Sequence, residues 1–343
     1  MQQLLSPGPL LNPQGELAQA GYATSLVKAY DRKAIRAAGF RIKEWDYYCI
    51  IDGDTVLALT IDDNSYMGLD SVTLIDLKES YEHTWSSIVP FPMGRRKLPS
   101  TSLAGDVEVV TEKYALSFGV KGDVRTLNAR VENFDQGKPL KASVTLRNTP
   151  RDSMVIATPW REDKKAFYYN QKINNFTAEG KVEFNGKTYL FNPSTAQGVL
   201  DWGRGVWTYR NTWYWGSLSG RSGVHRVGLN LGYGFGDTSA ASENMLFVDG
   251  IAHKLGTIDF GIPQDAKGEH QLMSPWHITE ESGRLDLVFT PLLDRASCTS
   301  ALVIESDQHQ IFGEYSGKVV TDSGEVLLLE AQRGFAEKVK NKW

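Results

Sequence analysis

The chain has 343 residues, of which 41% are hydrophobic and 23% are charged, as expected for a soluble globular protein of one or two domains. Its net charge of −4 and isoelectric point near 5.9 give no support for a nucleic-acid partner or an anionic membrane partner. No stretch approaches the roughly 18 apolar residues of a membrane span. Because the N-terminus lacks the pattern of a signal peptide and two cysteines make no disulfide framework, we expect a cytoplasmic protein.

Taken in order, the chain predicts an all-β protein with few short helices. Residues 1–24 are punctuated by Pro and Gly, and residues 25–38 are expected to form one short helix that Gly39 ends. A basic run, Arg95 to Lys97, lies in a segment rich in Pro, Gly and Ser, which we interpret as a solvated loop. Apolar–polar alternation and turn signals predict strands at 41–51, 55–61, 70–77, 107–111, 115–120, 126–132, 141–146, 165–170, 178–184, 187–191, 224–232, 244–249, 252–255, 256–260, 284–290, 310–320 and 325–332.

The stretch 198–216, GVLDWGRGVWTYRNTWYWG, is the densest in aromatic and charged residues. From Trp207 onward its residues alternate, which predicts one strand over 207–215 with an aromatic face. Asp201 lies near the start of this face. Aromatic residues dominate protein cores, so one interpretation is a stripe of the core. The other is that the face lines a pocket into which Asp201 points.

Two parts of the chain repeat each other. Gly180-Lys181-Val182 is followed by a turn, a strand and Asp201, and Gly317-Lys318-Val319 is followed by a turn, a strand and Glu337. Two copies of one strand set are the simplest explanation. We therefore expect an N-terminal extension over 1–39 and two β domains over 40–197 and 198–343.

The order of several motifs resembles that of a known superfamily. The motifs are E-W-D-Y-Y with a D-G turn, A-F-Y-Y-N, G-K-V with N-G-K, D-W-G-R-G, W-Y-W-G and G-F-A-E. They are similar to those of the tandem lipocalin-like superfamily of carotenoid hydratase, tocopherol cyclase and AttH-type proteins, in particular to a bacterial branch with D-W-G-R-G. The resemblance implies two tandem lipocalin-like (calycin) antiparallel β-barrels or sandwiches. It also implies a small hydrophobic ligand, isoprenoid or lipid-like, and no cofactor.

One position departs from the carotenoid hydratases, which carry a histidine between the acidic residue and Trp-Gly. Here Asp201 runs directly into Trp202-Gly203, an arrangement more similar to the cyclase. Burial among aromatic residues would keep Asp201 protonated, so that it could protonate an alkene or enol ether. Pairing with Arg204 or Arg210 would work against this. Glu337 stands in a basic tail, where we expect a salt bridge.

The candidate site residues follow from these patterns. The candidate catalytic residues are Asp201, Arg204 and Tyr209. The candidate ligand-binding residues are Trp45, Tyr47, Trp202, Trp207, Arg210, Asn211, Trp213 and Trp215.

Three functions stay open at this point. The first is a hydratase, cyclase or isomerase acting on an apolar molecule, and the second is a noncatalytic carrier of such a molecule. The third is a carbohydrate-binding or carbohydrate-active protein with an acidic pair. The histidines show no metal-binding spacing and no G-x-S-x-G motif occurs, so we expect neither a metal site nor a serine hydrolase. The oligomeric state is not predicted.

Overall fold

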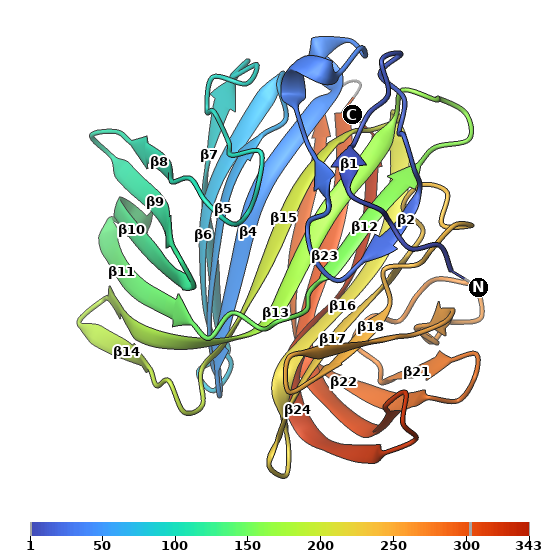
Figure 1. Cartoon of the computed structure of the whole chain (residues 1–343). Helices are drawn as coiled ribbons and strands as arrows, with labels where there is room; N and C mark the ends of the chain where they lie inside the picture. Colours follow the sequence, from blue (N-terminus) through green and yellow to red (C-terminus); the bar gives the residue numbers. More distant parts are fainter. Residues whose placement is uncertain (1, 302–303, 343) are drawn as a thin grey trace.

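The computed structural model describes residues 2–301 and 304–342, and its two large antiparallel sheets each curl into a half-barrel. Figure 1 shows the first sheet in blue to yellow-green and the second in yellow to red, with the two sheets side by side. Two 3-10 helices, η1 (Arg32–Ala34) and η2 (Gly39–Arg41), precede the strand Ile42–Asp52. No helix in the described part of the chain is long and apolar enough to cross a membrane.

The first sheet runs in the order β7-β6-β5-β4-β15-β13-β11-β10-β9-β8, with β12 and β14 paired to β13 and β2 paired to β12. β1 and β3 form a separate parallel pair. The strand bounds are β1 Gly8–Pro9, β2 Gly21–Ala23, β3 Lys28–Ala29, β4 Ile42–Asp52, β5 Thr55–Asp63, β6 Met67–Asp76, β7 Tyr81–Pro90, β8 Val107–Val110, β9 Tyr114–Lys121, β10 Val124–Asp135, β11 Lys138–Arg147, β12 Met154–Pro159, β13 Phe167–Phe184, β14 Lys187–Phe191 and β15 Gln197–Val206.

The second sheet runs in the order β19-β18-β17-β16-β24-β23-β22-β21-β20. Its strands are β16 Arg210–Ser222, β17 His225–Tyr233, β18 Met245–Val248, β19 Ile251–Lys254, β20 Ile258–Asp259, β21 Trp276–Glu280, β22 Leu285–Ala301, β23 Ile304–Val320 and β24 Val326–Lys342. β15 belongs to the first sheet, so the chain changes sheets between Val206 and Arg210, whereas the sequence predicted a division before residue 198.

The two sheets repeat one arrangement of strands. β15 lies between β4 and β13, as β24 lies between β16 and β23. The two G-K-V motifs occupy matching places: a Cβ on Gly180 would lie 2.2 Å from the Ser143 carbonyl oxygen, and one on Gly317 would lie 2.3 Å from the Asp286 carbonyl oxygen. Both glycines therefore allow a long strand to cross its neighbour closely. This tandem arrangement confirms the predicted fold class.

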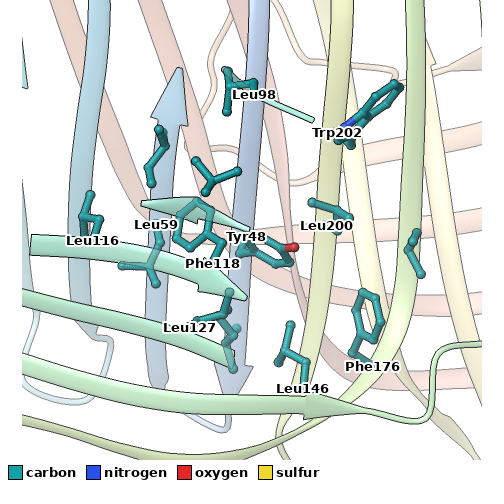
Figure 2. Close-up of a cluster of buried hydrophobic side chains, with 14 of the residues drawn as sticks. Tyr48, Leu59, Leu98, Leu116, Phe118, Leu127, Leu146, Phe176, Leu200 and Trp202 are labelled. Atoms are coloured by element: carbon teal, nitrogen blue, oxygen red, sulfur yellow. The ribbon is translucent and has the colours of Figure 1, made fainter. Parts of the chain in front are cut away.

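Alternation along the central strands separates two faces. On β15, Leu200 and Trp202 point into the core of the first half-barrel, where Figure 2 shows them with Tyr48 of β4. The odd-numbered neighbours point toward the second sheet. There Tyr47, Trp215 and Phe335 belong to a hydrophobic cluster to which both sheets contribute. Strand periodicity thus gives each central strand one face in a half-barrel core and one face between the sheets.

Several sequence predictions were wrong in detail. No helix spans 25–38, where the chain forms β3 and η1 instead. The strand predicted over 207–215 begins only at Arg210, because residues 207–209 connect β15 in the first sheet to β16 in the second. The strands predicted at 165–170 and 178–184 are one strand, β13, with a register shift between Ile173 and Phe176. The pattern did not indicate β7 or β12.

Candidate functional site

A cavity of about 200 Å³ lies between the two sheets and is partly open to solvent. Its walls come from both repeats, with β4, β13 and β15 on one side and β16, β23 and β24 on the other. The lining combines aromatic rings with charged and amide side chains. The lining residues are Trp45, Tyr47, Thr60, Asp62, Asn64, Leu69, Ser71, Tyr168, Lys172, Asp201, Trp207, Trp213, Trp215, Phe235, Glu243, Arg295, Gln308, Gln310, Glu337, Val339 and Asn341.

The D-W-G-R-G motif divides its side chains between the two faces of β15. Asp201 lines the cavity, whereas Trp202 and Arg204 are buried on the half-barrel side. The glycines make room for tryptophans: a Cβ on Gly203 would lie 2.0 Å from the Trp45 ring, and one on Gly205 would lie 3.1 Å from Trp207 Nε1. On its cavity face the motif therefore presents the carboxylate of Asp201 and two glycines, and the absence of side chains at the glycines lets aromatic rings pack against the backbone.

Gly203→Ala is expected to destabilise the fold by about 1–3 kcal/mol, because the added methyl group forces the Trp45 ring away from β15. Chemical denaturation followed by tryptophan fluorescence measures the loss. Gly39→Ala is the control, since a Cβ there would meet only Met93 Cε at 3.7 Å. Equal stability of the two variants would contradict the packing of Trp45 on Gly203.

Asp201 is held by an ion pair with a residue that the sequence did not single out. Lys172 Nζ lies 2.8 Å from Asp201 Oδ2 and 4.1 Å from the centroid of the Trp215 ring. Asn170 Nδ2 donates to Asp201 Oδ1 at 2.6 Å. With Lys172 on one oxygen and Asn170 on the other, the Asp201 carboxyl is placed as a hydrogen-bond acceptor rather than in the predicted role of acid.

Glu337 occupies the position in the second sheet that Asp201 occupies in the first. Asp201 pairs with Tyr47 and Lys172 across the strands, and Glu337 pairs with Trp215 and Gln310. In the second repeat a glutamine thus replaces the lysine. The prediction of a salt bridge for Glu337 was wrong: within the described residues no basic side chain lies within 4.0 Å of its carboxylate, although Lys172 and Arg295 line the same cavity.

The surroundings of Glu337 favour its protonated form. Burial raises the pKa of Glu337 to about 7; a hydrogen bond from Trp213 and the charge of Lys172 oppose this shift, and the charge of Asp201 adds to it. Trp213 Nε1 donates to Glu337 Oε1 at 2.8 Å, and Gln310 Nε2 donates to Oε2 at 3.3 Å. A carboxyl that exchanges its proton near neutral pH is suited to general acid catalysis.

Further charged groups complete the cavity. Burial raises the pKa of Glu243, and it raises the pKa of Asp62 to about 8. Arg295 connects the sheets, donating to Gln310 Oε1 at 2.7 Å and to Thr84 Oγ1 at 3.1 Å. Four carboxyl groups and two basic side chains therefore face one space. Within the described residues, no group of three or more His, Cys, Asp or Glu is placed to hold a metal ion.

The titration of Glu337 predicts a pH-dependent stability difference between the wild type and Glu337→Gln. Between about pH 4.5 and pH 7 the folded protein holds the proton and the unfolded chain does not, so the wild type loses stability as the pH rises. The variant lacks this contribution. The difference in free energy of unfolding is expected to move by about 3 kcal/mol in favour of the variant between roughly pH 4 and pH 8. Urea denaturation across this range measures it, and a constant difference would contradict the raised pKa.

The family model for a domain of unknown function, DUF2804, matches residues 1–343. The chain belongs to the DUF2804 family. No curated protein matches it.

Three solved structures are similar to this DUF2804 chain over most of its length. A protein from Nitrosomonas europaea described as AttH is 13% identical, with a TM-score of 0.55 over 92% of this chain and 98% of that one. CghA with Sch210972 is 10% identical, with a TM-score of 0.48 over 97% of each chain. Kievitone hydratase from Nectria haematococca is 11% identical, with a TM-score of 0.46 over 93% of this chain and 97% of that one. The AttH likeness agrees with the tandem lipocalin-like fold expected from the motifs.

The DUF2804 fold brings together only some of the residues that the sequence predicted for the site. Those that line the cavity are Trp45, Tyr47, Asp201, Trp207, Trp213 and Trp215. Arg204 and Trp202 lie on the opposite face of β15, and Arg204 pairs with Asp46 at 2.9 Å. Tyr209 and Arg210 are exposed beyond the cavity, and Asn211 Nδ2 donates to the Thr208 carbonyl oxygen.

The sequence reasoning missed Lys172, Glu243, Arg295 and Gln310. One signal was available for Lys172: on β13 it continues the alternation of Tyr168 and Asn170, two residues after the end of the quoted A-F-Y-Y-N motif. Extending the predicted strand by two residues would have placed a lysine on the aromatic face. Glu243 follows β17 in a connection of more than ten residues, where no periodicity applies.

Proposed function

We propose that the chain binds a small, largely apolar molecule in the cavity between its sheets and that Glu337 transfers a proton to this molecule. The observation that carries the proposal is the burial of Glu337 beside Trp213, which raises its pKa to about 7. Such a carboxyl is partly protonated at neutral pH, as a general acid requires. The supporting groups are the aromatic walls and the ion pair of Asp201 with Lys172.

The chemistry proposed for Glu337 is protonation of an alkene, an enol ether or a similar electron-rich carbon. The O–H bond of Glu337 breaks, a C–H bond forms, and the positive charge that develops on the substrate faces Trp and Tyr rings. Water adds to this cation in a hydration, whereas in a cyclisation or an isomerisation the cation loses a proton. In each case a proton returns to a carboxylate of the site, for which Glu337 and Asp201 are available.

The cavity limits the size of this molecule. A dry cavity of about 150 Å³ holds a single benzene ring, and the present one measures about 200 Å³. We therefore infer a compound of roughly one or two rings, or one end of a longer molecule that projects through the open side. A long isoprenoid chain does not fit inside the cavity as a whole.

A carrier without turnover is the second candidate. It is favoured by the polar groups of the cavity, which pair with one another: Asp201 with Lys172, Gln310 with Arg295, and Glu337 with Trp213. A cavity whose polar groups are paired before a ligand arrives can accept an apolar molecule without leaving them unsatisfied. The carbohydrate hypothesis rests only on the presence of several carboxyl groups and stays a prediction.

Native mass spectrometry of the full chain purified from a rich expression host tests the proposal. We expect a retained apolar compound, which is then extracted and identified. Conversion of this compound by fresh protein supports the enzyme, and retention without conversion supports the carrier. An empty protein whose thermal stability rises with sugars and not with apolar compounds would overturn both and favour the carbohydrate hypothesis.

A further inference from the structure

An exposed apolar surface lies at one end of the molecule, and the proposed function does not use it. Phe40 is 58% exposed, Ile88 64%, Phe91 63% and Met93 47%. The Met93 side chain lies beside Gly39, the residue before Phe40. We call these four residues the β7-end surface. Figure 1 places the end of β7 and the segment before β4 at the same end of the molecule. Exposed large apolar side chains that gather at one end of a molecule mark interaction sites.

The backbone presents two of these side chains in an uncommon conformation. Phe91 has a φ of 48° and Met93 a φ of 51°, values that non-glycine residues rarely adopt. Hydrogen bonds hold them there: Phe91 N donates to the Tyr66 carbonyl oxygen at 2.9 Å, and Met93 N donates to the Ser65 carbonyl oxygen at 3.0 Å. Such local strain persists only when the surrounding structure supports it, and it is frequent at functional sites.

The two segments that carry most of the β7-end surface are rich in basic residues. The segments 31–41 and 91–97 together carry seven basic residues and one acidic residue, in a chain whose net charge is −4. Arg32, Arg41 and Arg96 pair with acidic side chains. Lys33, Arg36, Arg95 and Lys97 are exposed, and within the described residues no carboxylate lies within ion-pair distance of them. Exposed aromatic and apolar side chains within a basic rim are typical of proteins that bind the surface of an anionic membrane.

The same surface adjoins the cavity. Ile88 pairs across the strands with Leu69, which lines the cavity together with Asp62 and Asn64. The loop that carries Phe91 and Met93 packs on the end of β5, next to Asp62. There Gly94 N, directly after Met93, donates to Asp63 Oδ2 at 2.8 Å. A bilayer against the β7-end surface would therefore lie close to the Asp62 side of the cavity.

We propose that the β7-end surface docks the protein on an anionic lipid bilayer, with Phe91 and Met93 inserted among the headgroups and the surrounding basic side chains over anionic lipids. This docking is independent of whether the cavity is catalytic. It gives the cavity access to apolar molecules that partition into membranes. Because the chain as a whole is negatively charged, the rest of its surface is repelled by such a bilayer.

Cosedimentation of the full chain with vesicles tests the docking. Vesicles of phosphatidylcholine are compared with vesicles that also contain about one-third phosphatidylglycerol, and we expect binding to the anionic vesicles that weakens as salt is added. Phe91→Asp/Met93→Asp is expected to lower the binding constant by roughly tenfold or more. Lys33→Gln/Lys97→Gln is expected to lower it by a similar factor, since each basic residue near the surface contributes to the attraction.

The control is Leu190→Asp/Val224→Asp, which changes two exposed apolar residues distant from this surface and should leave binding unchanged. Equal binding to both kinds of vesicle, or no binding by the wild type, would overturn the proposal. So would a dimer in lipid-free solution that Phe91→Asp/Met93→Asp dissociates, because the surface would then be an interface between two copies of the chain. Sedimentation velocity without lipid measures that outcome.

Discussion

Replacing Glu337 with glutamine is expected to lower turnover of the cavity's substrate by roughly 10²–10⁴-fold, because the amide cannot donate the proton. The amide oxygen can still accept the hydrogen bond from Trp213, so the cavity keeps its shape and the compound still binds. The measurement is a single-turnover rate with the compound recovered from the protein. In the wild type this rate should fall as the pH rises through about 7, since Glu337 then loses its proton.

Asp201→Asn distinguishes the role of Asp201 from the role of Glu337, the carboxyl at the equivalent position of the second repeat. It removes the negative partner of Lys172 and leaves Glu337 in place, so we expect a smaller loss of turnover and a change in its pH profile. If Asp201→Asn abolishes turnover while Glu337→Gln retains it, the acid is Asp201 and the assignment is reversed. Ligand retention by both variants, measured by native mass spectrometry, shows that the cavity is intact.

Arg204→Met is expected to lower the free energy of unfolding by about 3–5 kcal/mol, the cost of breaking a buried ion pair. Arg204 is completely buried, and its guanidinium donates to the carbonyl oxygens of Trp45, Gly203 and Pro99 as well as to Asp46. The methionine leaves all four acceptors without this donor. Burial already raises the pKa of Asp46. At low pH this carboxyl is protonated in Arg204→Met, which limits the loss of stability. The destabilisation should therefore increase with pH, as urea denaturation would show.

Arg210→Met is the matched control, because the same stretch of sequence carries this second arginine on the exposed start of β16. Its loss is expected to change stability by less than about 0.5 kcal/mol. Equal stability of the two variants would contradict the structural role of Arg204. Loss of the ligand by Arg204→Met without loss of stability would return Arg204 to the site.

Local pattern identified the fold class and six of the residues that line the cavity. Aromatic alternation marked Trp213 and Trp215, which line the cavity, and the repeat marked Asp201 and Glu337 as equivalent. These predictions succeed because successive side chains of a strand point to opposite faces, so that the local sequence alone shows which residues share a face. The same alternation failed across residues 207–209, where the chain leaves one sheet for the other and the period restarts. Tyr209 and Arg210 were misplaced for this reason.

The β architecture, the tandem repeat and the aromatic character of the wall between the sheets could be predicted from the amino-acid sequence, because these depend on local periodicity and residue type. The surroundings of the two repeat-related carboxyl groups could be seen only in the folded structure. Asp201 and Glu337 occupy equivalent strand positions, yet the neighbouring strand supplies Lys172 to the first and Gln310 to the second. A carboxyl's protonation depends on burial and on charges brought together from distant parts of the chain, and no local pattern encodes that proximity.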